Sequence, residues 1–235
     1  ALRSGSILAA YRAQPVDRPS PLILWTLDLA GLSEEDDLSR RLVERFAALK
    51  LLDHPNLLPV VDFGLEGAAF FWLTPFVRGK LLSTAIEEQA AARKARKKPE
   101  RAWNEKMAAR RLASIAGALH EIWEAGLTHG CLSPETVILT EDGAPLVFQH
   151  GLNDLFLEVE AARVPAGELS LGLAHPAFTA PERFAAQYVD WRADQFSLGA
   201  IAAAVCFGAS PFSAATPLES LLRGAAPLRW PGRPL

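Results

Sequence analysis

The pattern of hydrophobic positions predicts a small sheet and one helix in the first third of the chain. Short apolar segments are separated by turn-forming residues, and they lie at residues 8–13, 22–28, 57–63 and 68–74. Between the second and third segments, apolar residues recur at helical spacing until Asp53-His54-Pro55 ends the pattern. The helical face is formed by Leu38, Leu42, Phe46 and Leu49.

After Gly79 the pattern becomes mostly helical. One apolar face includes Leu112, Ile115, Leu119 and Ile122, and Gly126 is a helix stop. Two short strands are predicted at 137–139 and 146–148, and a buried helix at 194–208. We therefore expect an α+β protein with two lobes, formed by residues 1–77 and 78–235.

Composition limits the partners of this chain. Half of its residues are hydrophobic, its formal net charge is −3 and its pI is about 6.0, so we expect neither nucleic acid nor a membrane as a partner. The two cysteines, Cys131 and Cys206, lack a metal-ligand spacing and no segment resembles a secretory leader, which favours the cytoplasm. Because the chain begins at Ala1, we expect a domain of a larger multidomain protein.

Several segments share the order of landmarks of one protein family. Residues 129–136, 146–151, 180–182 and 194–199 resemble the catalytic loop, the metal-binding turn, the end of the activation segment and the central helix of protein kinases. In the first half, Tyr11-Arg12-Ala13, residues 21–27 and His54-Pro55-Asn56 are similar to bacterial-type (Hanks-type) serine/threonine kinases. Each motif alone is weak evidence, but their shared order and spacing together indicate the kinase family.

The resemblance implies a bilobal protein-kinase-like fold with a β-rich N-lobe and a mostly helical C-lobe. A kinase has further helices after the position of Phe212, so we expect a C-terminally incomplete fold. The residues that match structural positions of the family are His129, Gly151, Ala180, Pro181, Glu182 and Asp194.

The resemblance also places unusual residues at the nucleotide-binding positions. Trp25 corresponds to the phosphate-binding lysine, Ile23 to the small residue above adenine, and Arg45 (or Glu44, in a register shifted by one) to the helix glutamate. In the glycine-rich loop Gly5 matches, whereas Arg3 and Leu8 replace the outer glycines. The vestigial nucleotide cleft would comprise Gly5, Ile23, Trp25, Thr74, Phe76 and Val77.

The catalytic positions differ from the family pattern as well. Cys131 corresponds to the acceptor-orienting aspartate and Ser133 to the loop lysine, while Thr136 and Gln149 correspond to the magnesium ligands. Neutral oxygens bind a hard cation poorly in place of carboxylates. We therefore expect no catalytic residues, no metal and no cofactor.

Other interpretations of these residues remain open. Cys131 and His129 are close enough in sequence for a nucleophile and base, but a packing role is favoured. His150 beside Gln149 is a weak metal signal, since no paired carboxylate accompanies it. Thr179 and Ser170 lie where kinases are phosphorylated, but Gly130 replaces the arginine that reads such a phosphate.

The one strongly basic run is a possible interaction patch. It includes Arg93, Lys94, Arg96, Lys97, Lys98 and Arg101. A solvated helical insertion is the favoured alternative, because charge runs usually serve solubility.

From these features we expect a catalytically inactive kinase-like domain, a pseudokinase that is not an enzyme and acts as a protein-interaction, scaffold or regulatory module in signalling. The alternatives are a nucleotide-binding sensor and an atypical, residually active ATP-dependent serine/threonine kinase. An enzyme would need replacement carboxylates, for which the candidates are Asp28, Asp142, Asp154 and Glu158.

Overall fold

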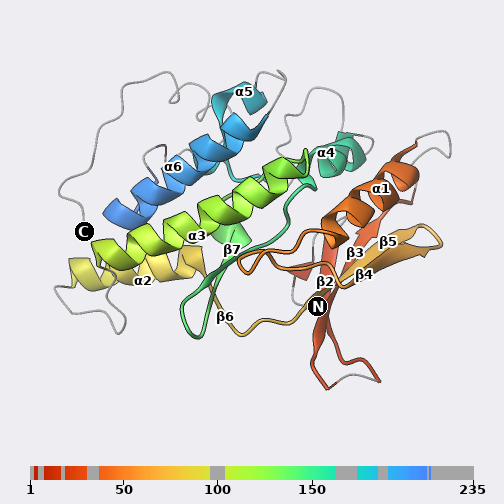
Figure 1. Cartoon of the computed structure of the whole chain (residues 1–235), viewed down its shortest axis with the longest axis horizontal. Helices are drawn as coiled ribbons and strands as arrows, with labels where there is room; N and C mark the ends of the chain where they lie inside the picture. The colour runs from red at the N-terminus through yellow and green to blue at the C-terminus, as the bar shows by residue number, and fades with distance from the viewer. Residues whose placement is uncertain are drawn as a thin grey trace.

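The molecule has two lobes, one rich in strands and one mostly helical (Figure 1). The computed structural model describes residues 3–4, 8–16, 19–30, 37–95, 104–161, 174–184, 190–210 and 212. The expected α+β bilobal fold is confirmed. The division at residues 77 and 78 stays a prediction, although strand pairing changes sheet between Pro75 and Gly79.

The N-lobe is a five-stranded antiparallel sheet covered by one helix. Its strand order is β1-β2-β3-β5-β4, and its elements are β1 (Arg3–Ser4), β2 (Leu8–Ala13), β3 (Leu22–Asp28), α1 (Leu38–Lys50), β4 (Asp62–Glu66) and β5 (Ala69–Pro75). All four residues of the predicted helical face, from Leu38 to Leu49, are buried. Periodicity alone therefore located α1 correctly.

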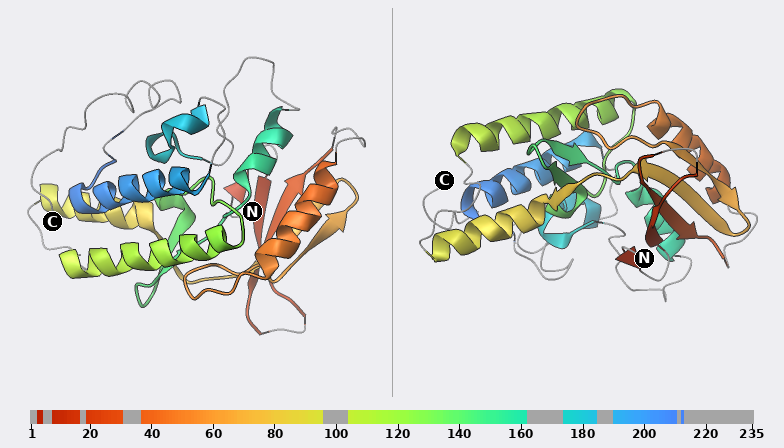
Figure 2. Two further views of the ribbon diagram at one scale, coloured as in Figure 1. Left: turned by 45° about the horizontal axis from the view of Figure 1, so that its top comes forward. Right: turned by 90° about the horizontal axis from the view of Figure 1, so that it is seen from below.

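The C-lobe is built on three long helices and a small sheet of order β6-β7-β8. Figure 2 shows α2, α3 and α6 packed side by side, with one end of α3 reaching the N-lobe. The elements are β6 (Gly79–Leu81), α2 (Leu82–Lys94), α3 (Glu105–Glu124), η1 (Pro134–Thr136), β7 (Val137–Thr140), β8 (Pro145–Val147), α4 (Asn153–Ala161), η2 (Pro176–Phe178), α5 (Pro181–Phe184) and α6 (Trp191–Phe207). Of the helices in these ranges, none has both the length and the hydropathy to cross a bilayer.

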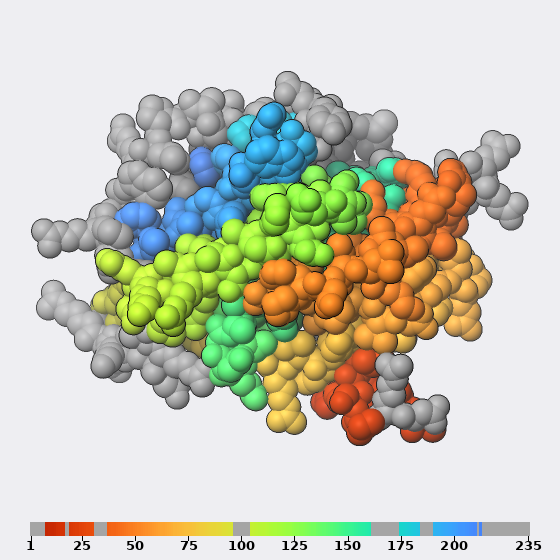
Figure 3. All heavy atoms as spheres, in the orientation of Figure 1, coloured from red at the N-terminus to blue at the C-terminus, as the bar shows by residue number. Residues whose placement is uncertain are grey.

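The prediction of a strand at residues 57–63 is wrong. Leu57 makes a single bridge to Val147, the Leu58 amide donates to the Val147 carbonyl, and β4 starts only at Asp62. This apolar segment instead links α1 to β4 and packs against β8 of the C-lobe, and the two lobes meet closely on the face shown in Figure 3. Its burial arises from a contact distant in sequence, so local pattern misassigned it.

Gly79 offers a test of the packing between β6 and β7. A Cβ at this position would overlap the main-chain carbonyl of Leu139, so Gly79→Ala is expected to lower the free energy of unfolding by about 1–3 kcal/mol. At Gly199, in α6, a Cβ meets no atom within 4 Å, and Gly199→Ala should raise it by up to about 1 kcal/mol. Urea denaturation measures both, and equal midpoints for the two variants would contradict the packing described here.

Candidate functional site

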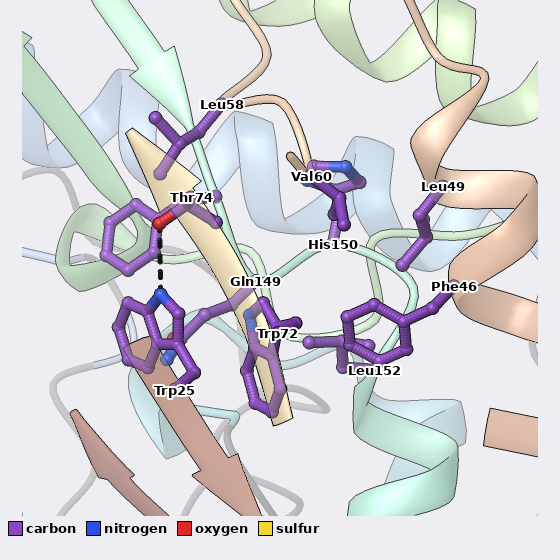
Figure 4. Close-up of a pocket in the computed structure, with 11 residues that line it drawn as sticks. Trp25, Phe46, Leu49, Leu58, Val60, Trp72, Thr74, Gln149, His150 and Leu152 are labelled. Carbon is purple, nitrogen blue, oxygen red and sulfur yellow. Dashed lines mark hydrogen bonds between the residues drawn. The ribbon is translucent and has the colours of Figure 1, made fainter. Parts of the chain in front are cut away.

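The indole of Trp25 fills the space between the N-lobe sheet and the start of the C-lobe. Trp25 lies in β3 opposite Trp72 of β5, and the two rings are stacked with centroids 5.8 Å apart and planes 5° from parallel. The Trp25 Nε1–H group donates to Thr74 Oγ1 over 3.1 Å, as Figure 4 shows. Phe148 lies 6.3 Å away between ring centroids. Stacking and the hydrogen bond both hold the indole inward.

Around this indole lies a small cavity, here called the inter-lobe cavity. The remaining space is about 20 Å³, which suits about one water molecule and excludes an adenine ring. The side chains that line it are Trp25, Phe46, Leu49, Leu58, Val60, Trp72, Thr74, Phe148, Gln149, His150 and Leu152.

The segment that joins the lobes follows directly from the Thr74 end of β5. Thr74 is buried and pairs with Ile23, which is also buried. The Phe76 amide donates to the Pro21 carbonyl over 3.1 Å, and the guanidinium of Arg12 lies 4.7 Å from the Phe76 ring centre. Thr74 thus contacts the indole and pairs with Ile23, and Phe76 follows two residues later, while Gly5 lies outside the described residues.

Arg45 of α1 points at the turn that follows β8. Its Nη1 donates to the Gly151 carbonyl, and its two terminal nitrogens lie 3.1 and 2.8 Å from the carboxylate oxygens of Asp154. One turn earlier, Arg41 pairs with Glu158 of α4. Glu44 lies on another side of the helix and pairs with Arg40, so Arg45, not Glu44, faces the site.

The catalytic-loop segment is buried and held by local hydrogen bonds. The Cys131 thiol lies 3.4 Å from the Gln149 carbonyl and 3.7 Å from His129 Nδ1. Ser133 and Thr136 form a reciprocal cap on η1. Burial lowers the pKa of His129 to about 3, with a further contribution from nearby Arg183. A neutral, fully buried histidine fits a packing role.

Gln149 and His150 bring polar groups to the cavity wall. Gln149 has φ of 62°, an uncommon conformation for a residue other than glycine. Its Nε2 and the Nδ1 of His150 are buried and have no hydrogen-bond partner among the described residues. Burial also lowers the pKa of His150 to about 3.

The residues here do not fit a magnesium ion, which prefers carboxylate oxygens. Over the described ranges, no three His, Cys, Asp or Glu side chains gather in a way that could hold a metal. The nominated carboxylates contact other groups: Asp28 the Ala30 amide, Asp142 the Thr140 hydroxyl, and Asp154 and Glu158 the arginines of α1.

Asp194 connects α6 to the catalytic loop. Its carboxylate accepts from the amides of His129 (2.7 Å) and Gly130 (3.0 Å) and from Trp123 Nε1 (3.2 Å). The Gly151 amide donates to the His129 carbonyl over 3.1 Å. His129, Gly151 and Asp194 are therefore brought together, whereas Ala180, Pro181 and Glu182 lie at and just before α5.

The remaining predicted positions are peripheral. Arg93 and Lys94 end α2, where Arg93 donates to the Cys206 carbonyl, and Arg96, Lys97, Lys98 and Arg101 lie outside the described residues. Ser170 also lies outside them. Thr179 is buried, with its hydroxyl donating to the His175 carbonyl.

Sequence reasoning missed Trp72, Arg41 and the whole of α4. Trp72 had a readable signal, because alternate residues of β5 (Phe70, Trp72, Thr74) are the buried ones. The arginine contacts to α4 had none, since they join residues more than a hundred positions apart.

Comparison with known proteins gives a consistent family. The model of the protein kinase domain matches residues 27–226. A DNA damage-responsive serine/threonine-protein kinase, RqkA of Deinococcus radiodurans, is 31% identical over 181 residues, which cover 76% of this chain and 25% of the relative. Serine/threonine-protein kinase PknL of Mycobacterium tuberculosis is 26% identical over 212 residues, covering 90% of this chain and 49% of the relative.

These curated relatives are larger proteins, and the chain spans between about a quarter and a half of their length. Among solved structures, the kinase domain of Mycobacterium tuberculosis PknI matches with a TM-score of 0.64 and 23% identity, over 91% of this chain and 74% of that one. This match supports the fold.

The prediction that the chain is not an enzyme is wrong. The relatives are named serine/threonine-protein kinases and the family model covers most of the chain, which points to an enzyme. The prediction inferred inactivity from residue identities at single positions. Those assignments at Trp25, Arg45, Cys131, Ser133, Thr136 and Gln149 stay predictions.

Proposed function

This chain belongs to the protein kinase family, in the bacterial serine/threonine branch, and from that premise we propose that it is the ATP-dependent domain of an atypical serine/threonine protein kinase. The observation that carries the proposal is the agreement of the family model and the named relatives over most of the chain. Its atypical character rests on Trp25, which lies where an entering nucleotide would need room.

Nucleotide entry requires the Trp25 indole to leave its place between Trp72 and Phe148. Its hydrogen bond to Thr74 is worth about 1 kcal/mol, and the stacking on Trp72 about 0.5–1.5 kcal/mol. Exposure of a large apolar side chain adds about 1.5–3 kcal/mol. A sum of about 3–5.5 kcal/mol would weaken nucleotide binding by about two to four orders of magnitude, so we expect an affinity no tighter than millimolar.

The described residues supply no carboxylate set for magnesium, so the proposal assigns no metal ligand and derives no step through a metal. What supports phosphoryl transfer is the family relationship. What supports nucleotide entry is the position of the Thr74–Val77 segment, which runs from the N-lobe sheet toward the C-lobe and begins at the residue that binds the indole.

Nucleotide titration of the wild type and of Trp25→Leu tests this proposal. Leucine removes the stacked indole but keeps an apolar side chain, so binding of ATP and ADP should tighten at least about 10-fold. Thermal shift, with and without magnesium or manganese, measures the affinity. Trp191→Leu is the matched control, because Trp191 is an exposed tryptophan of α6 that does not line the cavity. A flat response of both wild type and Trp25→Leu at millimolar nucleotide would contradict nucleotide binding.

Mass spectrometry of the same proteins after incubation with ATP tests the transfer step. A phosphoryl group that appears on serine or threonine, and appears faster in Trp25→Leu, supports the proposal. Nucleotide binding without any phosphoryl transfer to the chain or to a general protein substrate would leave the sensor alternative in its place.

Protein interaction is a second candidate role, carried by exposed cations at the end of α2. Arg93 and Lys94 are both exposed and begin the basic run of the sequence, which suits an acidic protein partner in the cytoplasm. Cross-linking capture with the wild type and with Arg93→Glu/Lys94→Glu tests this role. Identical captured proteins would count against it.

A further inference from the structure

Arg45 bridges the two walls of the inter-lobe cavity. One wall comes from α1, through Phe46 and Leu49, and the other from the turn after β8, through Gln149 and His150. Arg45 precedes Phe46 in α1 and donates to the carbonyl of Gly151, the residue after His150. The same guanidinium makes a two-point contact with Asp154. The walls cannot separate unless these contacts break.

The turn is shaped to receive α1. Gly151 has φ of 71°, and a Cβ there would lie 3.1 Å from Leu49 Cδ2 and 3.8 Å from Arg45 Cδ. A residue with a side chain would be strained at this φ and crowded by α1. On its other side, the Gly151 amide donates to the His129 carbonyl. The contact of Arg45 therefore reaches the catalytic loop through a single residue, Gly151.

The α1 wall is also coupled to the indole. Phe46 contacts Trp72 with ring centroids 5.1 Å apart, and Trp72 stacks on Trp25. A shift of α1 away from the turn would remove the packing behind Trp72. Separation of the walls would therefore also loosen the packing that holds the Trp25 indole.

We propose that Arg45 is a positioning residue that keeps the inter-lobe cavity closed by tying α1 to the Gln149–Gly151 turn and to α4. The nucleotide consequence rests on the proposed function, because ATP would enter only after this tie opens. The position of Arg45 and the closure of the turn are independent of any nucleotide.

Arg45 is better suited to this role than its neighbour Arg41. The side chains of Arg41 and Glu158 are 39% and 43% exposed, whereas that of Arg45 is 23% exposed and also binds a main-chain carbonyl. Exposed pairs contribute little, while hydrogen bonds from charged donors to partly buried acceptors contribute more. Loss of Arg45 should increase the open population about 10- to 100-fold, and loss of Arg41 at most about 5-fold.

The thiol of Cys131 is a built-in reporter of opening. It is 3% exposed and lies 3.4 Å from the Gln149 carbonyl, against the turn that Arg45 holds. In a Cys206→Ser background, the rate of its reaction with a disulfide reagent measures how often the turn separates from the catalytic loop. Arg45→Ala should react about 10- to 100-fold faster than the parent.

Two variants act as controls in the same background. Arg40→Ala removes an exposed arginine whose partners, Asp37 and Glu44, lie within or beside α1, and it should leave the rate unchanged. Arg45→Lys keeps the charge and one donor and should react at an intermediate rate. Urea denaturation of each variant separates local opening from global unfolding. An Arg45→Ala rate within about twofold of Arg40→Ala, or one explained fully by lower global stability, overturns the proposal.

Nucleotide titration of the same variants separates this proposal from the proposed function. Faster labelling of Arg45→Ala together with tighter ATP binding supports both. Faster labelling without ATP binding by any variant, Trp25→Leu included, supports the positioning role and overturns the nucleotide function. Unchanged labelling of Arg45→Ala, together with ATP binding by Trp25→Leu, supports the nucleotide function and overturns the positioning role.

Discussion

Replacement of Asp194 by alanine is expected to lower the free energy of unfolding by about 3–5 kcal/mol. The Asp194 side chain is almost fully buried and accepts three hydrogen bonds, two from main-chain amides of the catalytic loop and one from Trp123. Alanine would leave the two buried amides and the partly buried Trp123 Nε1–H without this acceptor, and each buried donor left unpaired costs about 1–3 kcal/mol. The loop and the N-terminal half of α6 should loosen together.

Two variants make the Asp194 result specific. Asp194→Asn keeps one acceptor oxygen, and because burial raises the pKa of the Asp194 carboxyl group, removal of its charge should be tolerated better than removal of the group. Asp190→Ala removes the more exposed N-cap of the same helix and should cost about 1 kcal/mol. Urea denaturation followed by circular dichroism measures all three. Equal losses for Asp194→Ala and Asp190→Ala would show that the buried hydrogen bonds contribute little.

The hydrophobic pattern of the sequence predicted the elements whose structure depends on residues close together in the chain. The apolar spacing of Leu38, Leu42, Phe46 and Leu49 is a property of one helix, and the glycine at Gly208, with φ of 82°, ends α6 as such residues do. Leu57 and Leu58 were misread because their burial comes from Val147, ninety residues later in the chain. A strand and a buried connection have the same apolar signature over a few residues.

The site divides in a similar way. Its position between the lobes followed from the family resemblance, but its closure by Trp25 depends on the register of β3 against β5, which sets Trp25 opposite Trp72. The contact of Arg45 with Gly151 depends on how α1 docks on the C-lobe. The sequence-based prediction of inactivity went further than residue identities allow, because an atypical residue at one position says nothing of how the whole cleft moves.

Acidification should destabilise this domain steeply, because burial lowers the pKa values of both His129 and His150 to about 3. In the unfolded chain both would titrate near 6.5. Their neutral forms therefore contribute stability that is fully present above pH 6.5 and is lost as the pH falls from 6.5 toward 3. Each histidine contributes a slope of about 1.4 kcal/mol per pH unit in that window, so the two together should remove up to about 5 kcal/mol between pH 6.5 and 4.5.

Asp194 acts in the opposite direction, since its raised pKa lets the folded state take up a proton before the unfolded state does. It offsets part of the loss at the acid end of the range. Urea denaturation in steps of about one pH unit, at pH 7.5, 6.5, 5.5 and 4.5, measures how the free energy of unfolding changes with pH. His150→Leu removes one of the two histidines and suits the largely apolar cavity wall, so the pH slope of its stability should be about half that of the wild type. The control His120→Leu, at an exposed position of α3, should leave the slope unchanged. A wild-type stability that stays constant between pH 6.5 and 4.5 would mean that the two histidines are not both buried and neutral. It would also contradict the closed packing of the catalytic loop against the Gln149–Gly151 turn.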